Sequence, residues 1–145
     1  MTMSTRPSSE SVYMRFAVIL AERATCDRLR VGAIVTDEDM LQVLGIGYNG
    51  NAAGLPNACD SADRPGQCGC LHAELNALLK SPGTLPNKVL FCTHAPCVAC
   101  AKAAINARVS RVFYLHEYRN TEGVKTLMKA GVDVKQLWLD PKHHD

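Results

Sequence analysis

The stretches His72-Ala73-Glu74 and Pro96-Cys97-Val98-Ala99-Cys100 decide the fold and the chemistry of this chain. Their histidine and two cysteines provide the three protein ligands that a catalytic zinc site typically has, with the fourth position left to water. Because Cys97 and Cys100 are three residues apart, they share one face of a predicted helix and can bind one ion. Pro96 is tolerated at the start of that helix, so both thiols are predicted near its N-terminus, where thiol pKa falls.

Glu74 follows His72 by two residues and is expected to carry protons instead of binding the metal. It lies about 200° around an ideal helix from His72, which places it poorly for sharing the ion. A carboxylate beside a zinc-bound water, whose pKa falls to about 7, can accept and return a proton. The alternative for the cysteines alone is a redox pair or half of a structural zinc knuckle.

The composition is that of an ordinary globular domain. With 145 residues, 47% hydrophobic and 21% charged, the chain is expected to form a single domain over residues 1–145, with residues 1–7 and 141–145 as loose tails. A net charge of +2 does not favour duplex nucleic acid as a partner. No apolar run reaches the roughly 18 residues of a membrane span, and the seven cysteines suit thiol and metal chemistry, so we expect a cytoplasmic protein without a membrane partner.

The hydrophobic periodicity predicts four helices and five strands in the order α-β-β-α-β-α-β-α-β. Ser8 and Ser9 are candidate caps for a first helix that runs to about Ala24. Its predicted apolar face consists of Val12, Phe16, Ile19 and Leu20. The expected strands are 31–36, 41–48, 88–93, 111–115 and 132–138, and the other helices lie near 71–80, 97–107 and 124–130.

This order predicts a three-layer α/β/α fold around a five-stranded mixed sheet. The first two strands are joined by the acidic turn at residues 37–39 and should form an antiparallel hairpin. The last three are joined through helices and should be parallel. Both metal-bearing helices follow loops on one side of this sheet, where open α/β folds place their sites.

The H-x-E…P-C-x-x-C spacing is typical of zinc nucleobase deaminases. Within that class, residues 70–78, residues 93–102 and the Gly47-Tyr48-Asn49-Gly50 stretch together resemble the deoxycytidylate (dCMP) deaminase family. The resemblance covers about residues 12–138. Asn76 and the Ala101-Lys102 pair distinguish the chain from tRNA adenosine deaminases and free cytidine deaminases.

The resemblance implies a cytidine deaminase-like fold and zinc-dependent hydrolysis of dCMP to dUMP and ammonia, which feeds thymidylate synthesis. Glu74 would then protonate the base at N3 and the leaving amine, and the Ala73 N–H would contact the base carbonyl. Asn49, Tyr118 and Arg30 are candidate substrate-binding residues. For Asn49 the alternative is a turn residue beside Gly50. Arg30 and Arg119 are candidates for contact with the 5′-phosphate or with an effector phosphate, and the alternative for both is a solvated surface charge.

Family resemblance also implies a homo-oligomer, a hexamer or a dimer, that responds to the effectors dCTP and dTTP. Tyr48, Gly50 and Arg119 are the candidate effector-binding residues. Ala52 stands where the family usually has proline, which leaves this loop less constrained.

A second, structural zinc is a further expectation. Some family members bind one through cysteines resembling Cys26 and Cys59, and Cys68 and Cys70 would complete a four-cysteine site here. His94 in place of one cysteine is a variant of this hypothesis, and four unrelated thiols are the alternative.

The motif specifies the reaction better than the substrate. Deamination of dCTP, of a 5-modified dCMP or of a nucleoside therefore stays open. A rival from another class is a non-catalytic, competence-associated zinc-binding module. Glu74 argues against that module, since a purely structural zinc needs no proton carrier.

Overall fold

The computed structural model describes residues 6–26, 28–60 and 68–139. The predicted tail at 141–145 and most of the tail at 1–7 lie outside these residues. The described elements are α1 (Ser9–Ala21), β1 (Gly32–Thr36), β2 (Val43–Tyr48), α2 (Ala73–Lys80), β3 (Lys88–His94), α3 (Val98–Asn106), β4 (Val109–His116), α4 (Glu122–Lys129) and β5 (Asp133–Gln136).

The strands form one five-stranded mixed sheet in the order β2-β1-β3-β4-β5. β1 pairs antiparallel with both β2 and β3, whereas β3, β4 and β5 are parallel. The predicted hairpin and the predicted parallel set are therefore confirmed. Because β3 and β4 are parallel neighbours, the segments that follow them leave the sheet at the same edge.

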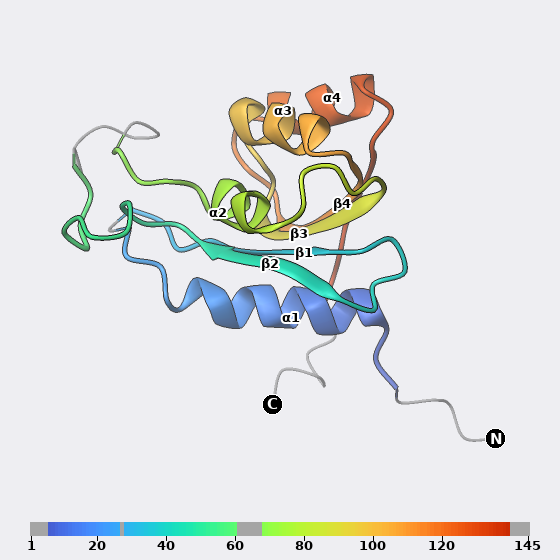
Figure 1. The fold of residues 1–145 in the computed structure, drawn as a ribbon, viewed down its shortest axis with the longest axis horizontal. Helices are drawn as coiled ribbons and strands as arrows, with labels where there is room; N and C mark the ends of the chain where they lie inside the picture. Colours follow the sequence, from blue (N-terminus) through green and yellow to red (C-terminus); the bar gives the residue numbers. More distant parts are fainter. Residues whose placement is uncertain (1–5, 27, 61–67, 140–145) are drawn as a thin grey trace.

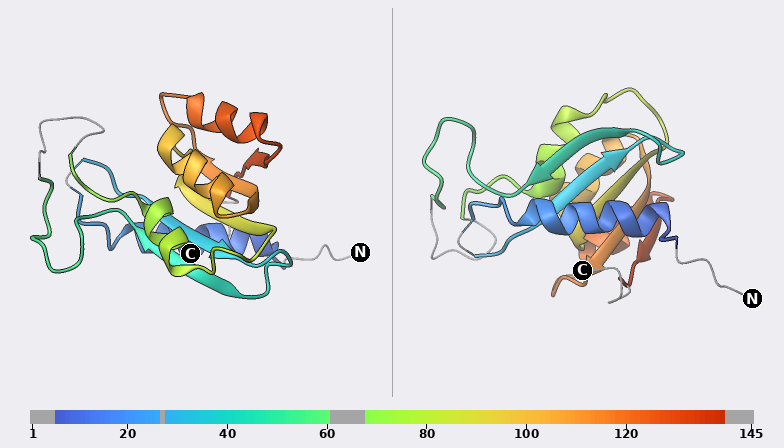
Figure 2. Two further views of the ribbon diagram at one scale, coloured as in Figure 1. Left: turned by 45° about the horizontal axis from the view of Figure 1, so that its top comes forward. Right: turned by 90° about the horizontal axis from the view of Figure 1, so that it is seen from below.

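Helices cover both faces of the sheet, which gives the predicted three layers (Figures 1 and 2). α1 lies alone on one face, whereas α2, α3 and α4 lie on the other. The α1 side packs Met14, Ala17 and Leu20 against sheet residues that include Phe91. The opposite side packs α2, α3 and α4 against the sheet through a core that contains Ala73, Ala77, Leu78, Ala101, Ala104 and Leu127.

The predicted apolar face of α1 is buried only at Leu20, and the predicted end of the helix is also wrong. Met14 and Ala17 are fully buried, whereas Ile19 is 60% exposed and Val12 and Phe16 are also exposed. The reason is a close approach that no helical pattern reveals: a Cβ on Gly32 of β1 would lie 1.9 Å from the Ala17 carbonyl oxygen. The small Ala17 must therefore face the sheet, and this turns Val12, Phe16 and Ile19 toward solvent. The helix ends at Ala21 instead of Ala24.

α2 packs almost as closely on β2. A Cβ on Gly47 would lie 2.2 Å from the Ala73 carbonyl oxygen, so only glycine fits here. The Asn76 Nδ2 donates a hydrogen bond to the Tyr48 carbonyl oxygen at 3.0 Å. Gly47, Tyr48 and Asn76, which carried the family resemblance, thus hold the end of β2 against the first turns of α2.

The remaining elements differ from prediction only at their ends. β4 starts two residues early, at Val109, and β5 is confined to Asp133–Gln136. Trp138, predicted to end that strand, is 81% exposed. Within the described part of the chain, no helix has the length and apolar character needed to span a membrane.

Candidate active site

His72, Cys97 and Cys100 come together between the starts of α2 and α3. The His72 Nδ1 lies 3.3 Å from the Cys100 Sγ and 3.5 Å from the Cys97 Sγ. Tetrahedral zinc with ordinary Zn–N and Zn–S bonds separates such atoms by about 3.5 Å. The donor set and its spacing therefore fit a zinc ion, with one coordination position left over.

Both motifs place a ligand at the N-cap of a helix instead of inside it. His72 caps α2 and Cys97 caps α3, and each has extended backbone angles. The predicted placement of Cys97 on the helix is thus wrong by one residue, since Pro96 precedes the cap and only Cys100 lies in the first turn. Neither side chain forms a capping hydrogen bond with the first N–H groups of its own helix. Both are therefore left to face the space between the helix starts.

The two thiols of this group differ strongly in acidity. Hydrogen bonds from Cys100 and then His72 lower the pKa of Cys97 to about 3. The same contact with Cys97, together with burial, raises the pKa of Cys100 far above its ordinary value. Cys97 is thus the more acidic of the two thiols, and metal binding requires both thiols to lose their protons.

Glu74 is buried beside these ligands. Only 5% of it is exposed, and burial is the main reason why its pKa rises to about 7. The His72 charge opposes this rise. A carboxyl group with a pKa near neutrality can both accept and release a proton, as a general acid–base group must.

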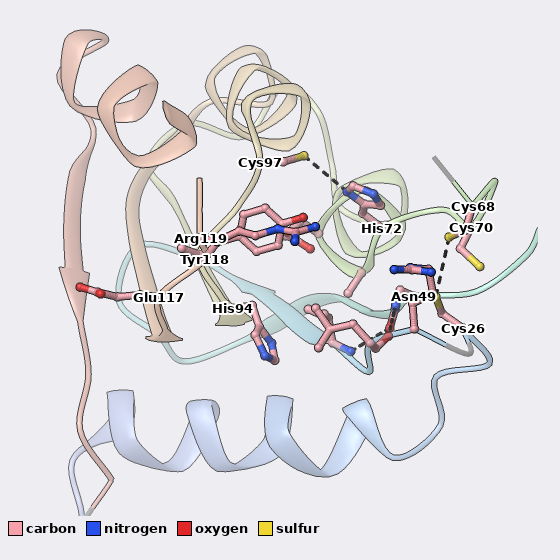
Figure 3. A pocket seen from close by; sticks show the side chains of 16 residues that line it. Cys26, Asn49, Cys68, Cys70, His72, His94, Cys97, Glu117, Tyr118 and Arg119 are labelled. Atoms are coloured by element: carbon pink, nitrogen blue, oxygen red, sulfur yellow. Dashed lines mark hydrogen bonds between the residues drawn. The ribbon is translucent and has the colours of Figure 1, made fainter. Parts of the chain in front are cut away.

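His72, Cys97 and Glu74 line a pocket of about 430 Å³ (Figure 3). Of the predicted substrate-binding residues, Asn49, Ala73 and Tyr118 line this pocket, together with Arg119. The Tyr118 and Arg119 side chains extend toward His72. A volume of a few hundred cubic ångströms is typical of small-molecule sites.

The structure does not bring Arg30 into this pocket. Arg30 lines a neighbouring cavity, and its guanidinium lies 3.5 Å from the Glu22 carbonyl oxygen. Arg28 lines the main pocket instead. The sequence carries no signal that separates these two arginines, because both lie between α1 and β1.

Asn49 serves the fold as well as the pocket. Its Oδ1 accepts the Val31 N–H at 2.8 Å, and its Nδ2 donates to the Leu29 carbonyl oxygen. One N–H of the amide is left for another acceptor. The proposed substrate contact of Asn49 therefore rests on that single N–H.

The candidate effector residues Tyr48 and Gly50 do not line the pocket. Gly50 pairs with Leu71 as an isolated bridge, and Arg23 lies over the Tyr48 ring at 5.8 Å. Arg119, the third candidate, lines the substrate pocket itself.

The sequence analysis did not predict that Arg28, His94 and Glu117 line the pocket, and it offered His94 only as a variant ligand of the second zinc. His94 stands beside the second ligand motif, so its proximity was a usable signal. Glu117 points away from His72 in Figure 3. Arg28 and Glu117 follow no pattern that would have found them.

The remaining candidate metal ligands, Cys26, Cys59, Cys68 and Cys70, form a second group. The sulfur atom of Cys26 lies 3.5 Å from that of Cys59 and 3.8 Å from that of Cys68, and Cys70 lies 3.5 Å from Cys59. All four ligand atoms lie within 4.8 Å of one another. Tetrahedral Zn–S geometry needs about 3.8 Å between sulfurs, and a disulfide about 2 Å. The group therefore fits zinc and is not disulfide-bonded; His94 is not part of it.

Residues 7–116 match the model of the cytidine and deoxycytidylate deaminase zinc-binding region. A crystal structure of dCMP deaminase from the cyanophage S-TIM5, in complex with dCMP and dUMP, is 36% identical, has a TM-score of 0.80, and matches across 92% of this chain and 100% of that one. The chain belongs to the cytidine and deoxycytidylate deaminase family. It has the cytidine deaminase-like fold.

Two curated relatives are similar at the sequence level. The deoxycytidylate deaminase of Saccharomyces cerevisiae is 35% identical across 91% of this chain and 46% of its own length. ComE operon protein 2 of Bacillus subtilis is 35% identical across 93% of this chain and 74% of its own length. The chain thus spans about half the length of the yeast relative.

Proposed function

We propose that this chain is a zinc-dependent dCMP deaminase, which converts dCMP to dUMP and ammonia. The observation that carries the proposal is the buried Glu74 beside the His72, Cys97 and Cys100 ligand group, on a pocket of about 430 Å³. The names of two relatives support the substrate: the yeast protein is a deoxycytidylate deaminase, and the S-TIM5 dCMP deaminase was crystallised with dCMP and dUMP.

His72, Cys97 and Cys100 would hold the catalytic zinc, which supplies an activated water when bound. Glu74 takes one proton of the water as its oxygen attacks C4 and delivers that proton to N3 of the cytosine ring. It then takes the second proton from the hydroxyl group now on C4 and passes it to the amino group, which leaves as ammonia while the C4 carbonyl forms. A pKa of about 7 suits this group to both transfers.

The first turn of α2 would orient the base. The N–H groups at the start of a helix lack partners within the helix, so the Ala73 N–H can donate to the carbonyl oxygen of cytosine. The remaining N–H of Asn49 can donate to the sugar or to the base. Tyr118 and Arg119 line the same pocket and would contact the bound nucleotide.

We also propose that Cys26, Cys59, Cys68 and Cys70 hold a second, structural zinc. Four thiolates fill a tetrahedral ion completely and leave no position for water. Cys59, Cys68 and Cys70 lie within the long loop between β2 and α2. The ion would join this loop to Cys26, which follows α1.

The family resemblance also supports a proposal about assembly and regulation. We expect a cytoplasmic homo-oligomer, hexameric or dimeric, with dCTP and dTTP as effectors. Tyr48, Gly50 and Arg119 are its candidate effector residues. None of the seven cysteines forms a disulfide, which suits a reducing compartment.

Ammonia release from dCMP, dCTP, deoxycytidine and cytidine, measured on the purified protein, tests the substrate. We expect dCMP to give the highest kcat/KM. A preference for dCTP would shift the function to another cytosine nucleotide, and no release from any of the four would leave the non-catalytic zinc module as the better account.

A further inference from the structure

His94 is a pocket residue to which neither the ligand group nor the proposed proton transfers assign a role. It ends β3 and pairs in register with His116 of β4, and the Ala95 N–H continues the pairing by donating to the His116 carbonyl oxygen. The two imidazole rings lie 5.0 Å apart. His94 lines the pocket together with Tyr118 and Arg119, whereas His116 does not.

A buried hydroxyl determines which nitrogen of His94 carries its proton. The Thr93 Oγ1 accepts the Gly32 N–H at 3.1 Å and lies 3.0 Å from the His94 Nδ1. Thr93 is only 3% exposed, so its own hydroxyl proton needs an acceptor inside the protein. Nδ1 is that acceptor, which leaves the proton of a neutral imidazole on Nε2. His94 is therefore built as a hydrogen-bond donor through Nε2.

The chemistry of the substrate indicates what this donor meets. In a cytosine nucleotide the sugar is attached to N1, directly across the ring from C4. If C4 faces His72, Cys97 and Cys100, the sugar and its phosphate must extend away from them. His94 and Arg119 line the same pocket, and both offer N–H donors of the kind that phosphate oxygens accept.

We propose that His94 is a specificity-determining residue that donates its Nε2–H to the phosphate of the nucleotide, so that the enzyme favours the monophosphate over the nucleoside. Thr93 is the positioning residue that holds the imidazole in this tautomer. The inference rests on the proposed function for its substrate class, and it adds a role for a residue that the deamination chemistry does not require.

The test compares two substrates on three variants. His94→Ala should lower kcat/KM for dCMP by about tenfold to a hundredfold, mainly through KM, and change that for deoxycytidine by less than about twofold. His94→Gln, whose amide can donate from a similar position, should recover most of the loss. Thr93→Val should show a smaller loss, again confined to dCMP. His116→Ala is the matched control and should behave as the unmodified protein.

An equal loss on dCMP and deoxycytidine would overturn the inference, because it would indicate a structural role or a sugar contact. No loss on dCMP would overturn it as well. Calorimetric binding of dUMP and deoxyuridine separates this inference from the proposed function. The His94→Ala substitution should weaken the binding of dUMP but not that of deoxyuridine, even in a protein that releases no ammonia. Equal affinity for dUMP in the unmodified protein and in His94→Ala would contradict the proposal.

Discussion

The two cysteine-containing groups differ in what holds their ligands in place. His72 and Cys97 are helix N-caps and Cys100 lies in a first helical turn, so the packing of α2 and α3 against the sheet positions all three. Cys26, Cys59, Cys68 and Cys70 instead lie on segments between α1 and β1 and between β2 and α2. We therefore expect the first group to form before metal binds and the second group to need metal to keep its shape.

The groups also differ in the number of ligands and in the residues that surround them. A site with three ligands, a buried carboxylate and a pocket can bind a substrate and catalyse its reaction. A site with four thiolates has no open coordination position, so its metal can only support the structure. The comparison teaches that ligand count and a nearby proton carrier, more than cysteine content, separate a catalytic metal site from a structural one. Each prediction below changes one side of this contrast.

Removing the proton carrier should have the largest effect. Glu74→Ala should lower kcat for dCMP by about 10² to 10⁴-fold, because no other carboxylate is buried beside the ligand group in the described residues. Zinc content should stay unchanged, since Glu74 is not a ligand. Ammonia release and elemental analysis measure the two quantities. Glu122→Ala, on the exposed side of α4, is the control, and unchanged turnover in Glu74→Ala would remove the mechanism.

Breaking the second group should cost stability more than chemistry. Cys59→Ser should remove one zinc per chain and lower the melting temperature by about 10 °C, since a lost structural ion costs several kcal/mol. Part of the deaminase activity should remain, because the His72 group keeps its ligands. Cys92→Ala provides the control, as Cys92 is a buried thiol outside both groups. Full retention of metal in Cys59→Ser would show that these four thiols bind none.

The close packing of α2 on β2, which positions the His72 group, can be tested without changing a ligand. Gly47→Ala should destabilise the fold by about 1 to 3 kcal/mol, because the new methyl group would meet the Ala73 carbonyl oxygen. It should also lower kcat, since α2 carries His72 and Glu74. Chemical denaturation and steady-state kinetics measure these effects. Gly83→Ala, with no atom within 4 Å of its added Cβ, should change neither quantity.

The sequence predicted local features well and close approaches poorly. The ligand motifs are short, so His72, Glu74, Cys97 and Cys100 could be assigned to one site from spacing alone. The parallel and antiparallel pairings followed from the order of the elements. The buried face of α1 could not be predicted, because it depends on contact between Ala17 and Gly32 of another element.

The pocket wall shows the same limit. Arg28 reaches the pocket and Arg30 does not, a difference that the turn between α1 and β1 decides. The importance of His94 depends on a hydrogen bond to Thr93, which is itself held by Gly32 of a different strand. Such contacts join residues far apart in the chain, and periodicity does not report them.

Anomalous scattering at the zinc absorption edge, measured on crystals of the protein as purified, tests the central claim most directly. The account predicts two peaks per chain, one bonded to His72, Cys97 and Cys100 with Glu74 beside its open position, and one enclosed by the four remaining cysteines of the second group. A structure in which the His72 group binds no zinc, or in which Glu74 is itself a ligand that closes the fourth position, would contradict it.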